Sequence, residues 1–108
     1  EHPGRYAAAR LPLDPETGEL IEGGIAEEAR RCLQNLAAVC QAAGARLEDA
    51  ARIAIYLTEM EGFPTVNEVY AEFFSEPFPV RSTVGVAALP KGALVEIDAT
   101  VPLTGGRA

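Results

Sequence analysis

Arg81 and Thr83 are the first residues whose types and spacing suggest chemistry. They follow Pro79 and Val80 in the segment PVRSTV, whose β-branched residues predict the start of a strand. Alternate residues of a strand share one face, so Arg81 and Thr83 are expected on the same side. A guanidinium there can hold a carboxylate through two parallel hydrogen bonds, with a hydroxyl beside it. The alternative is structural: an arginine that pairs with a surface glutamate, and a threonine that is ordinary in a strand.

Glu96 is the second candidate, because it lies between Val95 and Ile97 in a strongly apolar segment. A carboxylate that is buried in such a strand must be paired, or it takes up a proton and becomes neutral. It could position a water molecule or transfer protons. The alternative is a glutamate that faces solvent and alternates with core residues. Asp98 points to the same side, where we expect it to be exposed or at a rim.

Two other polar residues are weaker candidates. Arg10 follows three alanines in the first predicted strand and could add positive charge to a site. Asn67 lies off the apolar stripe of a predicted helix, where it is either solvated or fixes a loop or a partner chain. The three tyrosines are expected to be core or interface aromatics rather than catalytic phenols: Tyr6, Tyr56 and Tyr70.

Several classes of chemistry lack the residues that they need. The only histidine is His2, so neither a histidine relay nor a histidine-rich zinc site can be built. Cys32 and Cys40 lie eight residues apart in one predicted helix, roughly 12 Å along its axis, too far for an unstrained disulfide. We therefore expect two reduced, buried thiols. The sequence predicts neither a metal site nor a cofactor.

Charge and composition exclude further partners. The chain has 108 residues, of which 48% are hydrophobic, which fits one domain over residues 1–108. Nine basic and sixteen acidic residues give a net charge of −7, and no basic cluster exceeds Arg30-Arg31, which argues against nucleic acid as a partner. No apolar run approaches the roughly 18 residues of a membrane helix, and residues 1–13 lack the basic-then-apolar order that a secretion signal is expected to have. We expect a cytoplasmic protein.

Hydrophobic periodicity and turn residues predict the order strand, helix, strand, helix, strand, strand. The clearest element is a helix over residues 25–43, where apolar residues recur at spacings of three and four. The other predicted elements are strands over 5–13, 51–57, 81–88 and 93–102, a helix over 63–74 and a flexible tail over 103–108. The reversal at Leu89-Pro90-Lys91-Gly92 predicts that the last two strands form a hairpin.

Both predicted helices are apolar on one side only, so they are expected to cover one face of a single mixed sheet. The other face still carries apolar and small residues. Exposed apolar patches of this kind usually mark a subunit interface, which a closed homo-oligomer would bury. The composition does not fix the number of subunits.

Several segments resemble one known family. They are LPLDPETGE at 11–19, Asn35-Leu36, Ala42-Ala43-Gly44, VNEVYAEFF at 66–74, PVRSTV at 79–84 and, most distinctively, AALPKGALVEIDA at 87–99. In this order and with few gaps, about residues 6–101 are similar to the Rid family, also called YjgF or L-PSP. The resemblance implies an α+β, chorismate-mutase-like fold and a homotrimer with clefts between neighbouring subunits.

The same resemblance implies an activity and roles for particular residues. The activity is hydrolysis of reactive enamine or imine products of pyridoxal-phosphate enzymes, typically 2-imino acids, to a 2-oxo acid and ammonia. Arg81 would bind the substrate carboxylate, and Glu96 would orient the water that attacks the imine carbon. Thr83 falls where many members have cysteine and would line the pocket. Asn67 falls at a family position near the subunit contact.

The chain departs from the family pattern at its front, where the first family strand has no counterpart. Ala8, Ala9 and Arg10 stand where members usually carry Ser-Gly-Gln, which removes a hydroxyl and adds a methyl and a cation to the pocket wall. This change leaves open a non-catalytic trimeric protein that binds small carboxylates in the same cleft. A ribonuclease or translation inhibitor is a third interpretation, against which the acidic charge argues.

Overall fold

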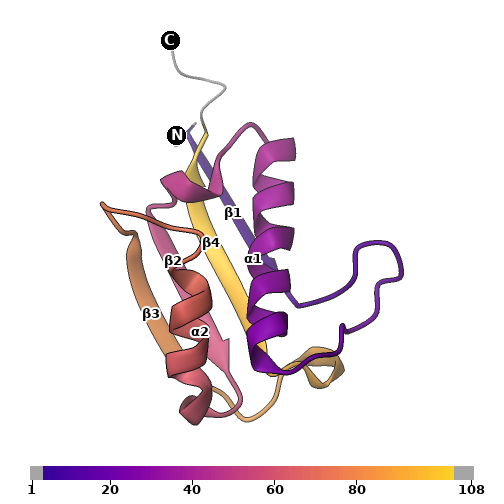
Figure 1. The fold of residues 1–108 in the computed structure, drawn as a ribbon. Helices are drawn as coiled ribbons and strands as arrows, with labels where there is room; N and C mark the ends of the chain where they lie inside the picture. Colours follow the sequence, from indigo (N-terminus) through magenta and orange to yellow (C-terminus); the bar gives the residue numbers. More distant parts are fainter. Residues whose placement is uncertain (1–3, 104–108) are drawn as a thin grey trace.

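A four-stranded mixed sheet with both helices on one of its faces forms the structure (Figure 1). The computed structural model describes residues 4–103. The strands are β1 Arg5–Arg10, β2 Arg52–Leu57, β3 Val80–Gly85 and β4 Val95–Pro102, and the helices are α1 Ile25–Ala42 and α2 Phe63–Tyr70. The α+β architecture expected from the sequence is therefore confirmed.

The strands lie in the order β1-β4-β2-β3, so β1 and β3 are the two edges of the sheet. β4 runs antiparallel to both β1 and β2, whereas β3 pairs in parallel with β2. The predicted hairpin between the last two strands is therefore wrong. The reversal at Pro90–Gly92 has hairpin-like residues, with Lys91 at φ 61° and Gly92 at φ 74°. Instead of forming a hairpin with β3, the chain after Gly92 crosses to the other side of β2 and forms β4 there. β4 then pairs with both β1 and β2, so its apolar row lies at the centre of the sheet.

The core fills the space between the helices and one face of the sheet. Alternation along β4 buries one row of side chains and leaves the other row, which includes Glu96 and Asp98, half-buried on the uncovered face. α1 contributes the stripe that its spacing predicts. The core residues that are at most 2% exposed include Ala29, Cys32, Leu33, Leu36, Cys40, Ile53, Ile55, Leu57, Val66, Val95, Ile97, Ala99 and Val101.

Several elements end earlier than the sequence predicts. β1 ends at Arg10, because Pro12 has no N–H to donate to a ladder. β3 ends at Gly85 and α2 at Tyr70, although Phe74 beyond the helix is still buried. Leu103, expected at the start of a flexible tail, forms an isolated bridge with Ala45. The rest of that tail, residues 104–108, lies outside the described residues.

One acidic residue belongs to the core. Glu27 and Glu28 both lie in the first turn of α1, but Glu28 is only 4% exposed. Its Oε1 accepts a hydrogen bond of 2.7 Å from the backbone N–H of Leu94. The carboxylate therefore ties the segment before β4 to the start of α1.

Loss of the Glu28 carboxylate should destabilise the fold. In Glu28→Ala the N–H of Leu94 loses its acceptor, which should lower the free energy of unfolding by about 1–3 kcal/mol in urea denaturation. Glu28→Gln keeps a side-chain oxygen and should retain part of that stability. Glu22→Ala, at an exposed position, is the control, and equal losses in Glu22→Ala and Glu28→Ala would contradict the role of this hydrogen bond.

Candidate functional site

Arg81 lies on the edge strand β3 and points toward the helices. In the parallel pairing of β3 with β2, Arg81 is the partner of Ile53, which belongs to the core under the helices. Paired residues point to the same face of a sheet, so Arg81 lies beside α2. Thr83 is the partner of Ile55 and is half-buried on the same face. The predicted common face of Arg81 and Thr83 is therefore confirmed.

Three residues of α2 surround the Arg81 guanidinium. Its Nη1 donates a hydrogen bond to Oδ1 of Asn67. Its Cζ lies 4.5 Å from the centroid of the Tyr70 ring and 5.5 Å from that of Phe63. Among residues 4–103 no carboxylate lies within ion-pair distance of Arg81, so the alternative of a surface pair with glutamate is wrong. Asn67 is not simply solvated, because its oxygen holds the arginine.

A cavity of about 430 Å³ opens beside this guanidinium. It is lined by Asn67, Tyr70, Ala71, Phe78, Pro79 and Arg81. Tyr70 is only 5% exposed, and its hydroxyl has no hydrogen-bond partner within the described part of the chain. Burial raises the pKa of Tyr70, and the charge of Arg81 lowers it by a smaller amount. A cation beside apolar walls suits a small carboxylate with an apolar body.

Glu96 lies on the opposite face of the sheet. It pairs with Tyr56 across β4 and β2, and both are half-buried on the face that no helix covers. On that face the Tyr56 hydroxyl donates a 2.9 Å hydrogen bond to Oδ2 of Asp98, which raises the pKa of Tyr56. Glu96 itself has no hydrogen-bond or ion-pair partner within residues 4–103. Glu96 alternates with buried residues of β4, as the second alternative predicts, and it is half-buried on the uncovered face rather than fully exposed.

A second cleft, of about 540 Å³, brings Glu96 together with Ala9 and Arg10 where β1 ends. Ala9 pairs with Asp98 and lies on the uncovered face, whereas Arg10 pairs with Ile97 and points toward the helices. Arg10 Nη1 donates a 2.6 Å hydrogen bond to the carbonyl oxygen of Ala9. The far wall comes from α1 and residues 11–18.

The predicted site residues therefore form two groups in one chain. Arg81 and Asn67 line the first cavity, and Ala9, Arg10 and Glu96 line the second. Thr83 lines neither of the two. Because the sheet separates Arg81 from Glu96, one copy of the chain cannot present both to the same small molecule.

The aromatic partners of Arg81 were not predicted from the sequence. The sequence predicts a helix over residues 63–74, with Tyr70 as a core or interface aromatic and Asn67 off the apolar stripe. The spacing of Phe63, Asn67 and Tyr70, four and then three residues, puts all three on one face of a helix. That spacing, together with a following arginine on a parallel edge strand, is the signal that could have identified the cluster.

The cysteines and the acidic residues offer no further chemistry. Cys32 and Cys40 are free, buried thiols, as predicted. Burial raises the pKa of both, which disfavours the reactive thiolate. Among the described residues no cluster of histidine, cysteine or carboxylate side chains could hold a metal ion. In the same part of the chain no helix is long and apolar enough to cross a membrane.

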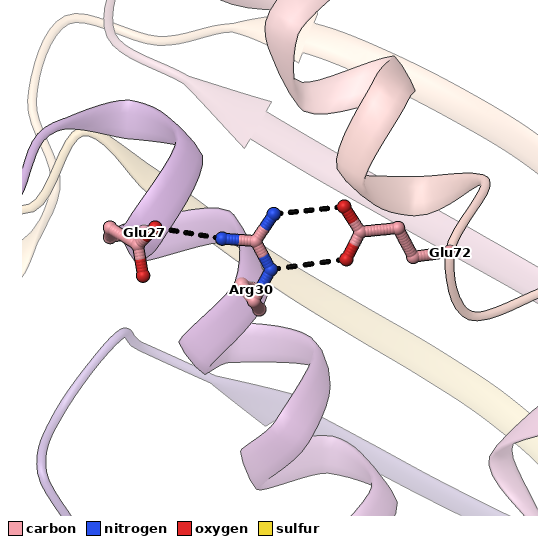
Figure 2. Close-up of polar contacts among 3 residues, drawn as sticks. All are labelled: Glu27, Arg30 and Glu72. Carbon is pink, nitrogen blue, oxygen red and sulfur yellow. Dashed lines mark hydrogen bonds and ion pairs between the residues drawn. The ribbon is translucent and has the colours of Figure 1, made fainter.

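An ion-pair network ties α2 to α1 (Figure 2). Arg30 of α1 donates from Nη2 and Nε to the two carboxylate oxygens of Glu72, at 2.8 and 3.1 Å. Its Nη1 bonds Glu27 at 2.8 Å. Glu72 lies two residues beyond the end of α2, and the bidentate pair lowers the pKa of its carboxyl group. The network links α1 to the segment that directly follows α2, the short helix that carries Asn67 and Tyr70.

The chain is similar to known proteins over most of its length. A family model described as Endoribonuclease L-PSP matches residues 5–102. RutC family protein PH0854 of Pyrococcus horikoshii is 44% identical over 94 residues, 87% of this chain and 75% of that protein. The 2-iminobutanoate/2-iminopropanoate deaminase of Dermatophagoides farinae is 42% identical over 96 residues, 89% of this chain and 75% of that protein. The crystal structure of RidA from Psychrobacter sp. PAMC 21119 matches with a TM-score of 0.89 at 38% identity, covering 95% of this chain and 84% of that chain.

Fold and sequence thus agree on one class, a small α+β protein with two helices on one face of a mixed sheet. The chain belongs to the Rid family, also called YjgF or L-PSP, as the resemblance of its segments indicated. The roles of Arg81 and Glu96 within that family fold stay predictions.

The ion pair of Arg30 with Glu72 should give a stability that depends on salt and pH. The pKa of Glu72 is lowered from its ordinary value of 4.5 in the folded state. Its contribution is therefore complete above that value and is lost as the pH falls through the lowered pKa. Glu72→Gln should melt at a lower temperature than the unmodified protein at pH 7, and the gap should close in acid.

The difference in melting temperature between Glu72→Gln and the unmodified protein should also shrink in about 1 M NaCl, where the Debye length is only ~3 Å. Glu68→Gln is the matched control, because Glu68 is exposed on the preceding helix α2 and forms no ion pair within the described residues. A gap for Glu72→Gln that is insensitive to both salt and acid would contradict the electrostatic role.

Proposed function

We propose that the protein hydrolyses reactive 2-imino acids to 2-oxo acids and ammonia. The observation that carries this proposal is the Arg81 guanidinium, whose Nε and Nη2 have no acceptor among residues 4–103 and which lies in a cavity with apolar walls. The name of the relative from Dermatophagoides farinae, 2-iminobutanoate/2-iminopropanoate deaminase, supports the same activity at 42% identity.

Arg81 binds the substrate in this proposal. Nε and Nη2 form a planar fork that matches the two oxygens of a carboxylate. Because Nη1 donates its hydrogen bond to Asn67, Nε and Nη2 are the nitrogens that remain for the ligand. Thr83 lies on the same face of β3 but does not line the Arg81 cavity of a single chain, so its place in the pocket wall stays a prediction.

Glu96 handles the protons. It takes a proton from a water molecule as the water oxygen attacks the imine carbon, and returns it to the imine nitrogen, which gives a carbinolamine. A second transfer, from the carbinolamine hydroxyl to the amino group, lets ammonia leave as the C–N bond breaks and the C=O bond forms. The reaction consumes one water molecule without oxidation or reduction, so it requires no cofactor.

Two copies of the chain supply one site. Arg81 and Glu96 lie on opposite faces of one sheet, so we infer that Arg81 of one copy meets Glu96 of another, in the homotrimer with interfacial clefts that the family resemblance implies. Exposed apolar side chains on the edge strand, Val80 at 65% and Val84 at 44%, support burial of this edge by a second copy. We assign this assembly to the cytoplasm.

A second candidate function is binding without turnover. The observation that favours it is Arg10, a cation in the same cleft as Glu96. An arginine binds anions and cannot accept a proton, so it favours binding over hydrolysis. Saturable binding of a 2-oxo acid with no effect on the decay of 2-imino acids would identify this function. The net charge of −7 disfavours ribonuclease activity.

Replacement of Arg81 should abolish the activity. A 2-imino acid is generated in situ by an amino-acid oxidase or a dehydratase, and its decay is followed with and without the protein. We expect faster decay with the protein, and a fall of at least about 100-fold in kcat/KM for Arg81→Ala, because the carboxylate loses a charged bidentate partner. Decay at the uncatalysed rate with the unmodified protein, or an unchanged rate in Arg81→Ala, would refute the deaminase.

Mixed oligomers test whether one site draws on two copies. Arg81→Ala and Glu96→Gln chains should each be inactive alone. When they are co-assembled at equal amounts, about a quarter of the sites should combine an intact Arg81 with an intact Glu96, because the two come from different copies. If both residues acted within one chain, the mixture would stay inactive.

A further inference from the structure

We propose that Tyr70 is a positioning residue, whose ring fixes the Arg81 guanidinium in the orientation that receives a carboxylate. The inference rests on the proposed function, since it concerns the same carboxylate site. It assigns a role to a residue that lines the Arg81 cavity but was not among the predicted site residues.

The geometry places the ring directly under the charge. Cζ of Arg81 lies 4.5 Å from the centroid of Tyr70, well within the roughly 6 Å over which a cation is attracted to an aromatic face. The Phe63 ring is more distant, at 5.5 Å. The Tyr70 ring therefore makes the shorter of the two cation–π contacts with the Arg81 guanidinium.

The ring is itself immobilised. Tyr70 is 5% exposed and stacks on Phe74, with ring centroids 4.5 Å apart and an interplanar angle of 28°. Its hydroxyl is buried and has no hydrogen-bond partner among the described residues, whereas its ring contacts the guanidinium. The ring face, not the hydroxyl, is the part of Tyr70 that acts.

The contact matters because an unsupported arginine must lose rotamer freedom when it binds an anion. The ring constrains the guanidinium from one face and Asn67 occupies Nη1. Nε and Nη2 are thereby presented as a preformed fork. The Arg81 side chain therefore loses less conformational entropy when it binds the carboxylate. Loss of the ring should weaken carboxylate binding although the charge is unchanged.

Titration of the product analogue 2-oxobutanoate by calorimetry tests the inference. Tyr70→Leu removes the ring and should raise Kd by about tenfold. Tyr70→Phe keeps the ring and should recover most of the affinity that Tyr70→Leu loses. In turnover, Tyr70→Leu should raise KM more than it lowers kcat. Val66→Ala is the matched control, because it removes buried volume from the same helix and Val66 is not one of the three α2 residues that surround the guanidinium.

A double-mutant cycle separates positioning from general damage. In an Arg81→Ala background, Tyr70→Leu should cause no further loss of affinity, because its effect passes through the arginine. The inference is overturned if Tyr70→Leu, with its melting transition intact, binds as tightly as the unmodified protein, or if Val66→Ala weakens binding equally. Absence of 2-oxobutanoate binding to the unmodified protein would instead remove the proposed function and this inference together.

Discussion

The guanidinium of Arg81 lies over the ring of Tyr70 and bonds the side chain of Asn67, and the proposed chemistry depends on that arrangement. Both partners come from α2, a helix of only eight residues, which is too short to be stable alone. Its position comes from packing in the shared core and from the ion pair of Arg30 with Glu72 at its end. The binding group is thus ordered by contacts that reach back to α1.

The sheet acts as a partition between two kinds of surface. On the helix side, Arg81 is enclosed by aromatic and amide groups; on the other side, Glu96 lies with Tyr56 and Asp98 on a face that no helix covers. A carboxylate and a guanidinium on the same side of one chain could pair with each other, which would neutralise both. Their separation keeps each available for a substrate, and it makes the proposed activity a property of the assembly.

Much of the fold followed from the sequence, because periodicity reports which face of an element is buried. The stripe of α1 and the alternation along β4 both appeared where expected. The pairing of β4 could not be predicted from the sequence. The residues at Pro90–Gly92 are compatible both with a β3–β4 hairpin and with a connection that places β4 between β1 and β2. Only long-range packing decides between the two, and it places β4 where it has two neighbours.

The candidate site was predictable in its residue types but not in its arrangement. Arg81 and Glu96 were identified from their apolar surroundings and the family resemblance, yet their opposite faces depend on which strands pair. The sequence predicts Tyr70 only as a core or interface aromatic, because a ring that packs in a core and a ring that supports a cation have the same spacing. The difference lies in the neighbouring strand, which a local pattern does not contain.

The positions of β1 and β3 at opposite edges of the sheet have a consequence for symmetry. The Arg81 cavity lies beside one edge and the Glu96 cleft beside the other, so a contact that unites them joins unlike surfaces. Such a head-to-tail contact is heterologous, and it either closes into a ring or propagates as a fibre. In a closed ring every copy gives one surface and receives the other, so the number of complete clefts equals the number of chains.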